Sequence, residues 1–94
     1  MSRADAQSLM NLLDDVRLWV RRPNNNYRWS TWKGPEDALR ELDAIEKTIA
    51  GGSVPTRALK LLFAATGSLQ ELSVSSGWGN EFLRLATRCD TILG

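Results

Sequence analysis

The sequence predicts an all-α fold, a compact single domain of four to five short helices that spans residues 1–94. Apolar residues recur at three- and four-residue steps along most of the chain, which places them on one face of a helix. Glycine and proline divide the chain into stretches of helix length. No stretch of useful length shows the alternation of apolar and polar residues that is typical of a half-buried strand. A chain of 94 residues is close to one typical domain, with material for a single core.

The first helix is expected at residues 3–21. Its apolar residues repeat at helical spacing and should face the core: Leu9, Leu12, Leu13, Val16, Trp19 and Val20. Ser2 can cap the start of this helix, with Asp5 three residues later in the first turn. Pro23 ends it, because proline cannot continue a helix.

The second helix is expected at residues 35–50, where Gly51 and Gly52 follow the last apolar position. Its core-facing stripe consists of Ala38, Leu42, Ile45 and Ile49. Two acid–base pairs lie four residues apart, Glu36 with Arg40 and Asp43 with Lys47. Each such pair stabilises a helix by about 0.2–0.5 kcal/mol. The acids of this helix scatter around it and should form a solvated face: Glu36, Asp37, Glu41, Asp43 and Glu46.

The second half of the chain is expected to hold three shorter helices, at residues 55–65, 69–76 and 80–93. Ser68 and Glu71 match a capping box, which favours helix over strand for the stretch that follows. Asn80 can cap the last helix. The inward face of that last helix should consist of Phe82, Leu85, Ala86, Cys89 and Ile92.

Residues 23–34 (PNNNYRWSTWKG) form the one long irregular segment, which is expected to pack across one end of the helices. Asn24, Asn25 and Asn26 favour turns, because their side chains bond to nearby backbone groups. Two of the four tryptophans lie outside this segment and are expected to have structural roles. Trp19 belongs to the apolar face of the first helix, and Trp78 lies between two glycines, where it can cover the adjacent core.

Aromatic and basic residues cluster in and beside the irregular segment. Between Val16 and Pro35 there are five basic residues and no acid. Such clusters are typical of protein interface anchors, and they would also suit stacking on nucleic-acid bases beside phosphates. The structural alternative turns the tryptophans inward and leaves the arginines in water. The residues predicted to bind a partner are Tyr27, Arg28, Trp29, Trp32, Arg21 and Arg22.

Residues 69–88 offer an alternative site. Ser73 lies four residues before Gly77, and apolar positions follow in the next helix. This spacing resembles the helix–turn–helix pattern of bacterial repressors, which implies a small DNA-binding regulator. The residues that would then face DNA are Asn80, Glu81, Arg84 and Arg88. Only two of these are basic, although DNA affinity usually requires several phosphate contacts.

Catalytic and metal-binding patterns are missing from the sequence. There is no histidine, the commonest general base and zinc ligand, so no catalytic residue, metal or cofactor is assigned. The single cysteine, Cys89, lies on an apolar helical stripe, where cysteines are mostly inert. An enzyme is therefore the least favoured class.

The function that the sequence favours is a non-enzymatic protein–protein interaction module, and adaptor, antitoxin and immunity-like roles all fit. The expected partner is a protein, and a homodimer also fits so small a core. The net charge of +1 gives no general argument for nucleic acid or acidic membranes. Because there is only one cysteine, no disulfide can form within the chain, which fits a cytoplasmic protein. The longest unbroken apolar run covers only residues 61–65, so we expect no membrane span.

Overall fold

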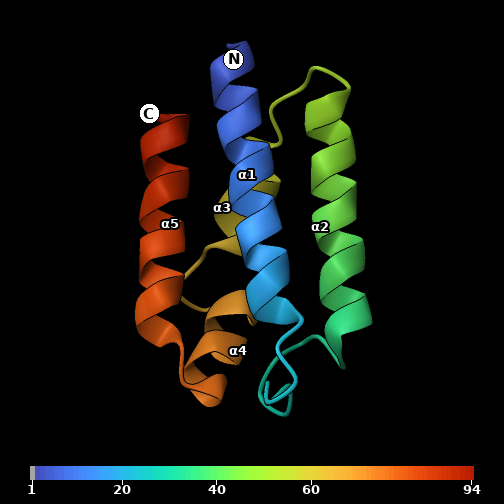
Figure 1. The fold of residues 1–94 in the computed structure, drawn as a ribbon, viewed down its shortest axis with the longest axis vertical. Helices are drawn as coiled ribbons and strands as arrows, with labels where there is room; N and C mark the ends of the chain where they lie inside the picture. Colours follow the sequence, from blue (N-terminus) through green and yellow to red (C-terminus); the bar gives the residue numbers. More distant parts are fainter. Residues whose placement is uncertain (1) are drawn as a thin grey trace.

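Five α-helices make up residues 2–94, the part of the chain that the computed structural model describes, and they confirm the all-α prediction. The helices are α1 (Arg3–Val20), α2 (Pro35–Ala50), α3 (Thr56–Leu62), α4 (Ser68–Ser76) and α5 (Gly79–Leu93). The three long helices run side by side with α1 between α2 and α5 (Figure 1). The short helices α3 and α4 complete the bundle, and α4 packs against α5.

The core lies around α1, because this helix contacts a long neighbour on each side. The inward faces predicted for the three long helices are confirmed, apart from Trp19, Ala86 and Ile92, which are half-buried. The buried residues of these helices are Leu9, Leu12, Leu13, Val16, Val20, Ala38, Leu42, Ile45, Ile49, Phe82, Leu85 and Cys89. Burying each large aliphatic side chain contributes about 1.5–3 kcal/mol, so these faces hold the long helices together.

The helix α3 is shorter than predicted, since it ends at Leu62 and not at residue 65. The cause is a close backbone approach at Gly67. A Cβ atom added to this glycine would lie only 2.9 Å from the carbonyl oxygen of Leu61. The chain therefore leaves the helix at Phe63 and turns through Ala64, whose carbonyl accepts a hydrogen bond from the Gly67 amide.

Two of the three predicted helix caps are wrong. Ser2 does cap α1, because its Oγ accepts a hydrogen bond of 3.0 Å from the Asp5 amide. Ser68 is the first residue of α4 and not its cap; the Glu71 amide donates to the Gly67 carbonyl instead. Asn80 lies inside α5, which begins one residue earlier, at Gly79.

The two ion pairs predicted within α2 are replaced by others. Arg17 of α1 reaches across to Asp43 at 2.9 Å and Glu46 at 3.2 Å, and Arg40 pairs with Asp37. Burial opposes ionisation of the Arg17 guanidinium, but hydrogen bonds and charges from both carboxylates outweigh it and raise the Arg17 pKa. Asp14 of α1 also pairs with Arg17, at 3.0 Å, so three carboxylates surround this one guanidinium. Such a cluster stabilises the fold more than a single exposed pair along a helix, which explains why the predicted pairs do not form.

Replacing Gly77 with alanine is expected to destabilise the fold by about 1–2 kcal/mol. Gly77 ends α4 in the left-handed region, with φ of 87°, where a Cβ is strained. The measurement is urea unfolding followed by circular dichroism. The matched control is Gly79→Ala, because Gly79 lies inside α5 and a Cβ there would meet Val74 at an ordinary 3.6 Å. Equal losses of stability in the two variants would contradict this assignment.

Candidate functional site

The segment between α1 and α2 folds across the end of the bundle opposite the two chain termini (Figure 1). It is tied to α4 by three hydrogen bonds. The Asn26 amide donates to Ser76 Oγ at 2.8 Å, and Ser75 Oγ donates to the Asn26 carbonyl at 2.7 Å. Ser30 Oγ donates to the Ser68 carbonyl at 3.1 Å. The predicted packing across one end is confirmed.

Asn25 joins this segment to both α1 and the start of α5. Its Nδ2 donates to the carbonyls of Trp19 at 2.7 Å and Val20 at 2.9 Å, at the end of α1. Its Oδ1 accepts a hydrogen bond of 2.9 Å from Trp78 Nε1. One side chain thus satisfies two carbonyls that the helix end leaves without intrahelical donors, as well as a buried indole.

Trp19 and Trp78 stack beneath this segment, with ring centroids 5.2 Å apart and ring planes inclined by 28°. Trp78 is buried, and Trp19 is half-buried and packs against the core. The Arg22 guanidinium lies 4.7 Å from the centroid of the Trp19 ring, a cation–π contact. Both tryptophans have the structural role that the sequence predicts.

Two of the six predicted partner-binding residues turn inward. Trp32 is only 6% exposed and belongs to the core. Tyr27 is half-buried, and its hydroxyl donates a hydrogen bond of 2.7 Å to the Val20 carbonyl. Burial raises the pKa of the Tyr27 phenol. Both side chains hold the segment against the bundle. Trp32 is buried, so it leaves almost no surface for a partner, contrary to the prediction.

The other four predicted residues are exposed. They lie at the end of the bundle where the segment between α1 and α2 folds, and we call them the Trp29 surface: Arg21, Arg22, Arg28 and Trp29. The Trp29 side chain is 65% exposed, and its only aromatic or cation–π contact within residues 2–94 is with the Arg28 guanidinium, 5.5 Å from its ring centroid. Among residues 2–94, no carboxylate lies within 4.0 Å of these three guanidinium groups.

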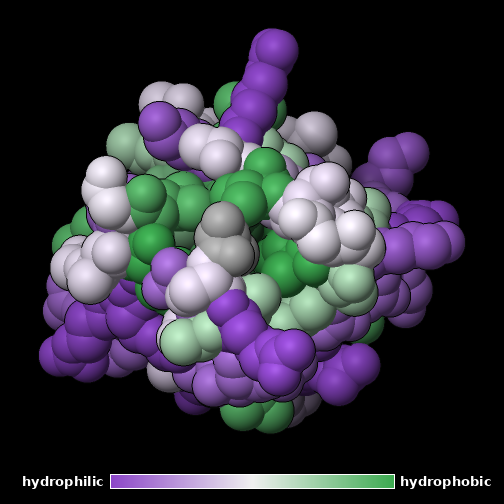
Figure 2. All heavy atoms as spheres, turned by 90° about the horizontal axis from the view of Figure 1, so that it is seen from above, coloured by the Kyte–Doolittle hydropathy of each residue, from purple (hydrophilic) through white to green (hydrophobic). Residues whose placement is uncertain are grey.

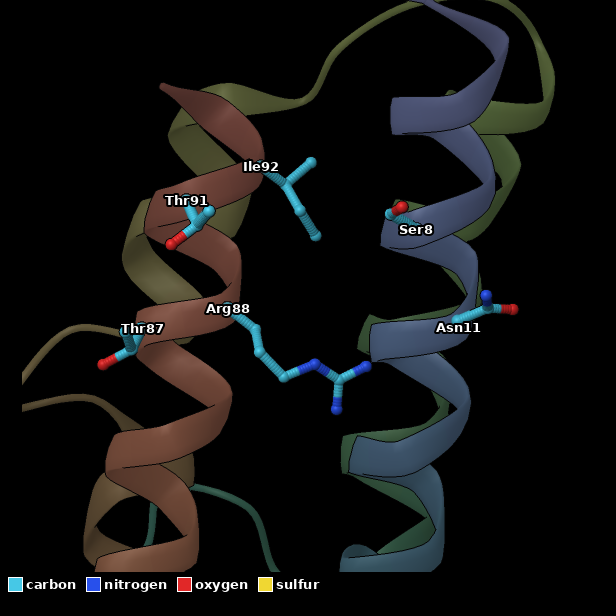
Figure 3. Close-up of a pocket in the computed structure, with 6 residues that line it drawn as sticks. All are labelled: Ser8, Asn11, Thr87, Arg88, Thr91 and Ile92. Carbon is cyan, nitrogen blue, oxygen red and sulfur yellow. The ribbon is translucent and has the colours of Figure 1, made fainter.

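The alternative DNA-facing residues lie on α5. Asn80 and Arg84 are exposed, and Glu81 is half-buried. Arg88 reaches toward α1 (Figure 3), where its guanidinium pairs with Asp15 at 2.6 Å. The charge of Arg88 is thus already compensated, which leaves Arg84 as the one basic side chain of this set without an ion-pair partner among residues 2–94.

A shallow pocket of about 350 Å³ lies between α1 and α5. It is lined by Ser8, Asn11, Thr87, Arg88, Thr91 and Ile92. Figure 3 shows Ile92 pointing into the gap between the helices, whereas Thr87 and Thr91 point away from α1. Its polar groups do not converge on one point, so the pocket does not define a ligand.

The opposite end of the bundle, where both termini lie, has apolar side chains gathered near its middle within a hydrophilic rim (Figure 2). A hollow of about 460 Å³ at this end is lined by Ser2, Arg3, Ala6, Ile49, Ala50, Gly52 and Ser53.

Groups that could perform chemistry are sparse. Among residues 2–94, no three cysteine or acidic side chains are grouped so that they could hold a metal ion. Cys89 is buried, and burial raises the pKa of its thiol to about 11. Since the thiolate is the nucleophile, this cysteine is protonated at neutral pH.

Comparison of the chain with protein-family models, with curated proteins and with solved structures gives no match. Within residues 2–94, none of the helices has the length and apolar character needed to cross a membrane. The fold therefore defines a five-helix all-α domain, with an aromatic and basic surface at one end.

Proposed function

We propose that this protein is a protein–protein interaction module whose partner binds the Trp29 surface. The observation that supports the proposal is the exposure of Trp29. Trp32 and Trp78 are buried and Trp19 is half-buried, whereas Trp29 is 65% exposed. Tryptophan and arginine are the residues most enriched at the centres of protein interfaces, and both are present here.

The segment that carries Trp29 is held in place before any partner arrives. Its hydrogen bonds to α4, the cap that Asn25 forms on α1 and the burial of Trp32 fix the backbone on both sides of Trp29. A preorganised loop loses little conformational entropy on binding. This arrangement favours recognition through a fixed surface.

The charge of the surface favours a partner with acidic side chains. Arg21, Arg22 and Arg28 have no ion-pair partner among residues 2–94. A guanidinium can bind a carboxylate through two parallel hydrogen bonds. Adaptor, antitoxin and immunity-like roles would each use such a contact with a protein.

The test is affinity capture from the native cell with wild-type, Trp29→Ala and Leu83→Ala baits. Both termini lie at the other end of the bundle, so a terminal tag leaves the surface open. Leu83 is a matched control, since it is 60% exposed but lies on α5. We expect the partner to be retained by wild type and Leu83→Ala, and its affinity for Trp29→Ala to fall by about 2 kcal/mol, or roughly thirtyfold.

Equal capture by the Trp29→Ala and wild-type baits would refute the proposal. So would a loss that is specific to Leu83→Ala, because it would place the interface on α5. Circular dichroism of each bait establishes that the variants are folded.

A further inference from the structure

The side of α5 that faces away from α1 is exposed along its length. Helix α5 lies at the edge of the bundle, with α1 on its inner side (Figure 1). Figure 3 shows the side chains of Thr87 and Thr91 pointing away from α1. Five exposed residues recur at helical spacing on this side, and we call them the α5 face: Leu83, Arg84, Thr87, Asp90 and Thr91.

Part of the α5 face is apolar. Leu83 is 60% exposed, and Val74 at the edge of α4 is 61% exposed. Val74 adjoins the face, because its Cγ2 lies 3.6 Å from the position of a Cβ on Gly79, one helical turn before Leu83. The hydroxyl of Thr87 donates to the Leu83 carbonyl at 2.9 Å. Covering Thr87 therefore strands no hydroxyl donor and buries its methyl group.

The α5 face also carries one basic and one acidic side chain. Arg84 lies three residues before Thr87, and Asp90 lies three residues after it. Neither has an ion-pair partner among residues 2–94. Arg88, on the α1 side of the helix, already pairs with Asp15. Opposite charges thus lie at equal distances from the centre of the face.

This arrangement is complementary to itself. When a two-fold axis crosses a pair of antiparallel helices, residues at equal distances on either side of the axis meet each other. With the axis at Thr87, Arg84 of one copy lies opposite Asp90 of the other, and the contact occurs twice. Leu83 lies opposite Thr91 in the same pairing. A parallel pair would instead place Arg84 against Arg84, so the charges select the antiparallel arrangement.

We propose that the α5 face joins two copies of this chain as an antiparallel homodimer, with Arg84 of each copy bound to Asp90 of the other. The threonines at its centre are small enough for the two helices to approach closely. The face extends about 12 Å along the helix, from Leu83 to Thr91. Because so small a face gives a weak dimer, we expect a dissociation constant on the order of 10–100 µM.

The test is sedimentation equilibrium of the purified protein at concentrations on either side of that dissociation constant. The mass of the wild type should rise with concentration from that of one chain toward that of two. Arg84→Asp and Asp90→Arg each place like charges at both contacts, so each variant should dimerise about tenfold more weakly or less. An equimolar mixture of the two variants should regain dimerisation, because opposite charges then meet at both contacts.

The matched control is Arg57→Asp, which makes the same change of charge at an exposed position on α3. It should dimerise like the wild type. Three results would overturn the proposal: a wild type that stays monomeric, charge reversals that weaken dimerisation no more than Arg57→Asp does, or a mixture that associates no better than either variant alone. Circular dichroism establishes that each variant is folded. The purified chain is measured alone, so the result does not depend on whether a partner binds the Trp29 surface.

Discussion

Replacing Trp78 with alanine is expected to lower the free energy of unfolding by about 3–5 kcal/mol. Trp78 is the largest fully buried side chain, with 1% exposure. Its loss removes the stack on Trp19 and leaves Asn25 without the indole donor. Because a domain of this size has only about 5–15 kcal/mol of stability, the midpoint of urea unfolding should fall sharply. Circular dichroism at 222 nm measures that midpoint.

The matched control for Trp78 is Trp29→Ala. It removes the same side chain from a position that is 65% exposed, so the free energy of unfolding should change by less than about 0.5 kcal/mol. A large loss of stability in Trp29→Ala would mean that Trp29 is a structural residue, which would also weaken the proposed interface. A small loss in Trp78→Ala would contradict its place in the core.

Asn25→Ala is expected to cost about 1–3 kcal/mol, because it leaves the buried indole nitrogen of Trp78 without its acceptor. The carbonyls of Trp19 and Val20 lose one donor each but keep another, from the Arg22 amide and the Tyr27 hydroxyl. The measurement is again urea unfolding. The control is Asn24→Ala, since Asn24 is the exposed neighbour and should contribute little. Equal effects at the two positions would show that the amide of Asn25 does not fix the segment.

Much of the fold could be predicted from the sequence, because helical periodicity depends on local spacing. The buried positions of the long helices follow directly from that spacing, from Leu9 in α1 to Cys89 in α5. The ends of the short helices could not be predicted as well. Ser68 and Glu71 match a local capping pattern, but the backbone of Gly67 packs against Leu61 and moves the start of α4. A contact of this kind is visible only when the chain is folded.

The candidate site was only partly predictable for the same reason. The cluster of aromatic and basic residues marked the segment, but its composition could not decide which tryptophan faces outward. Trp32 is buried and Trp29 is exposed, and Ser30, between them, bonds to Ser68, far away in the sequence. A contact between such distant residues cannot be predicted from local composition. The asparagine run was a better guide, since Asn25 does bond to nearby backbone as its residue type predicts.

Glu41 is exposed, as expected for the solvated acids of α2, but the groove of about 260 Å³ that it lines between α2 and α3 could not be predicted from the sequence. The groove itself depends on where α3 packs, and a short helix of seven residues gives little indication of its position.

The exposure of Trp29 is tested most directly by acrylamide quenching of tryptophan fluorescence in the wild type and in Trp29→Phe. Acrylamide quenches an indole that it can touch, and Trp29 alone has most of its side chain in solvent. Trp29→Phe should therefore remove most of the quenchable emission and shift the remaining spectrum to shorter wavelength. Quenching that is the same in both proteins would show that Trp29 is shielded, and the surface proposed to bind a partner would not exist.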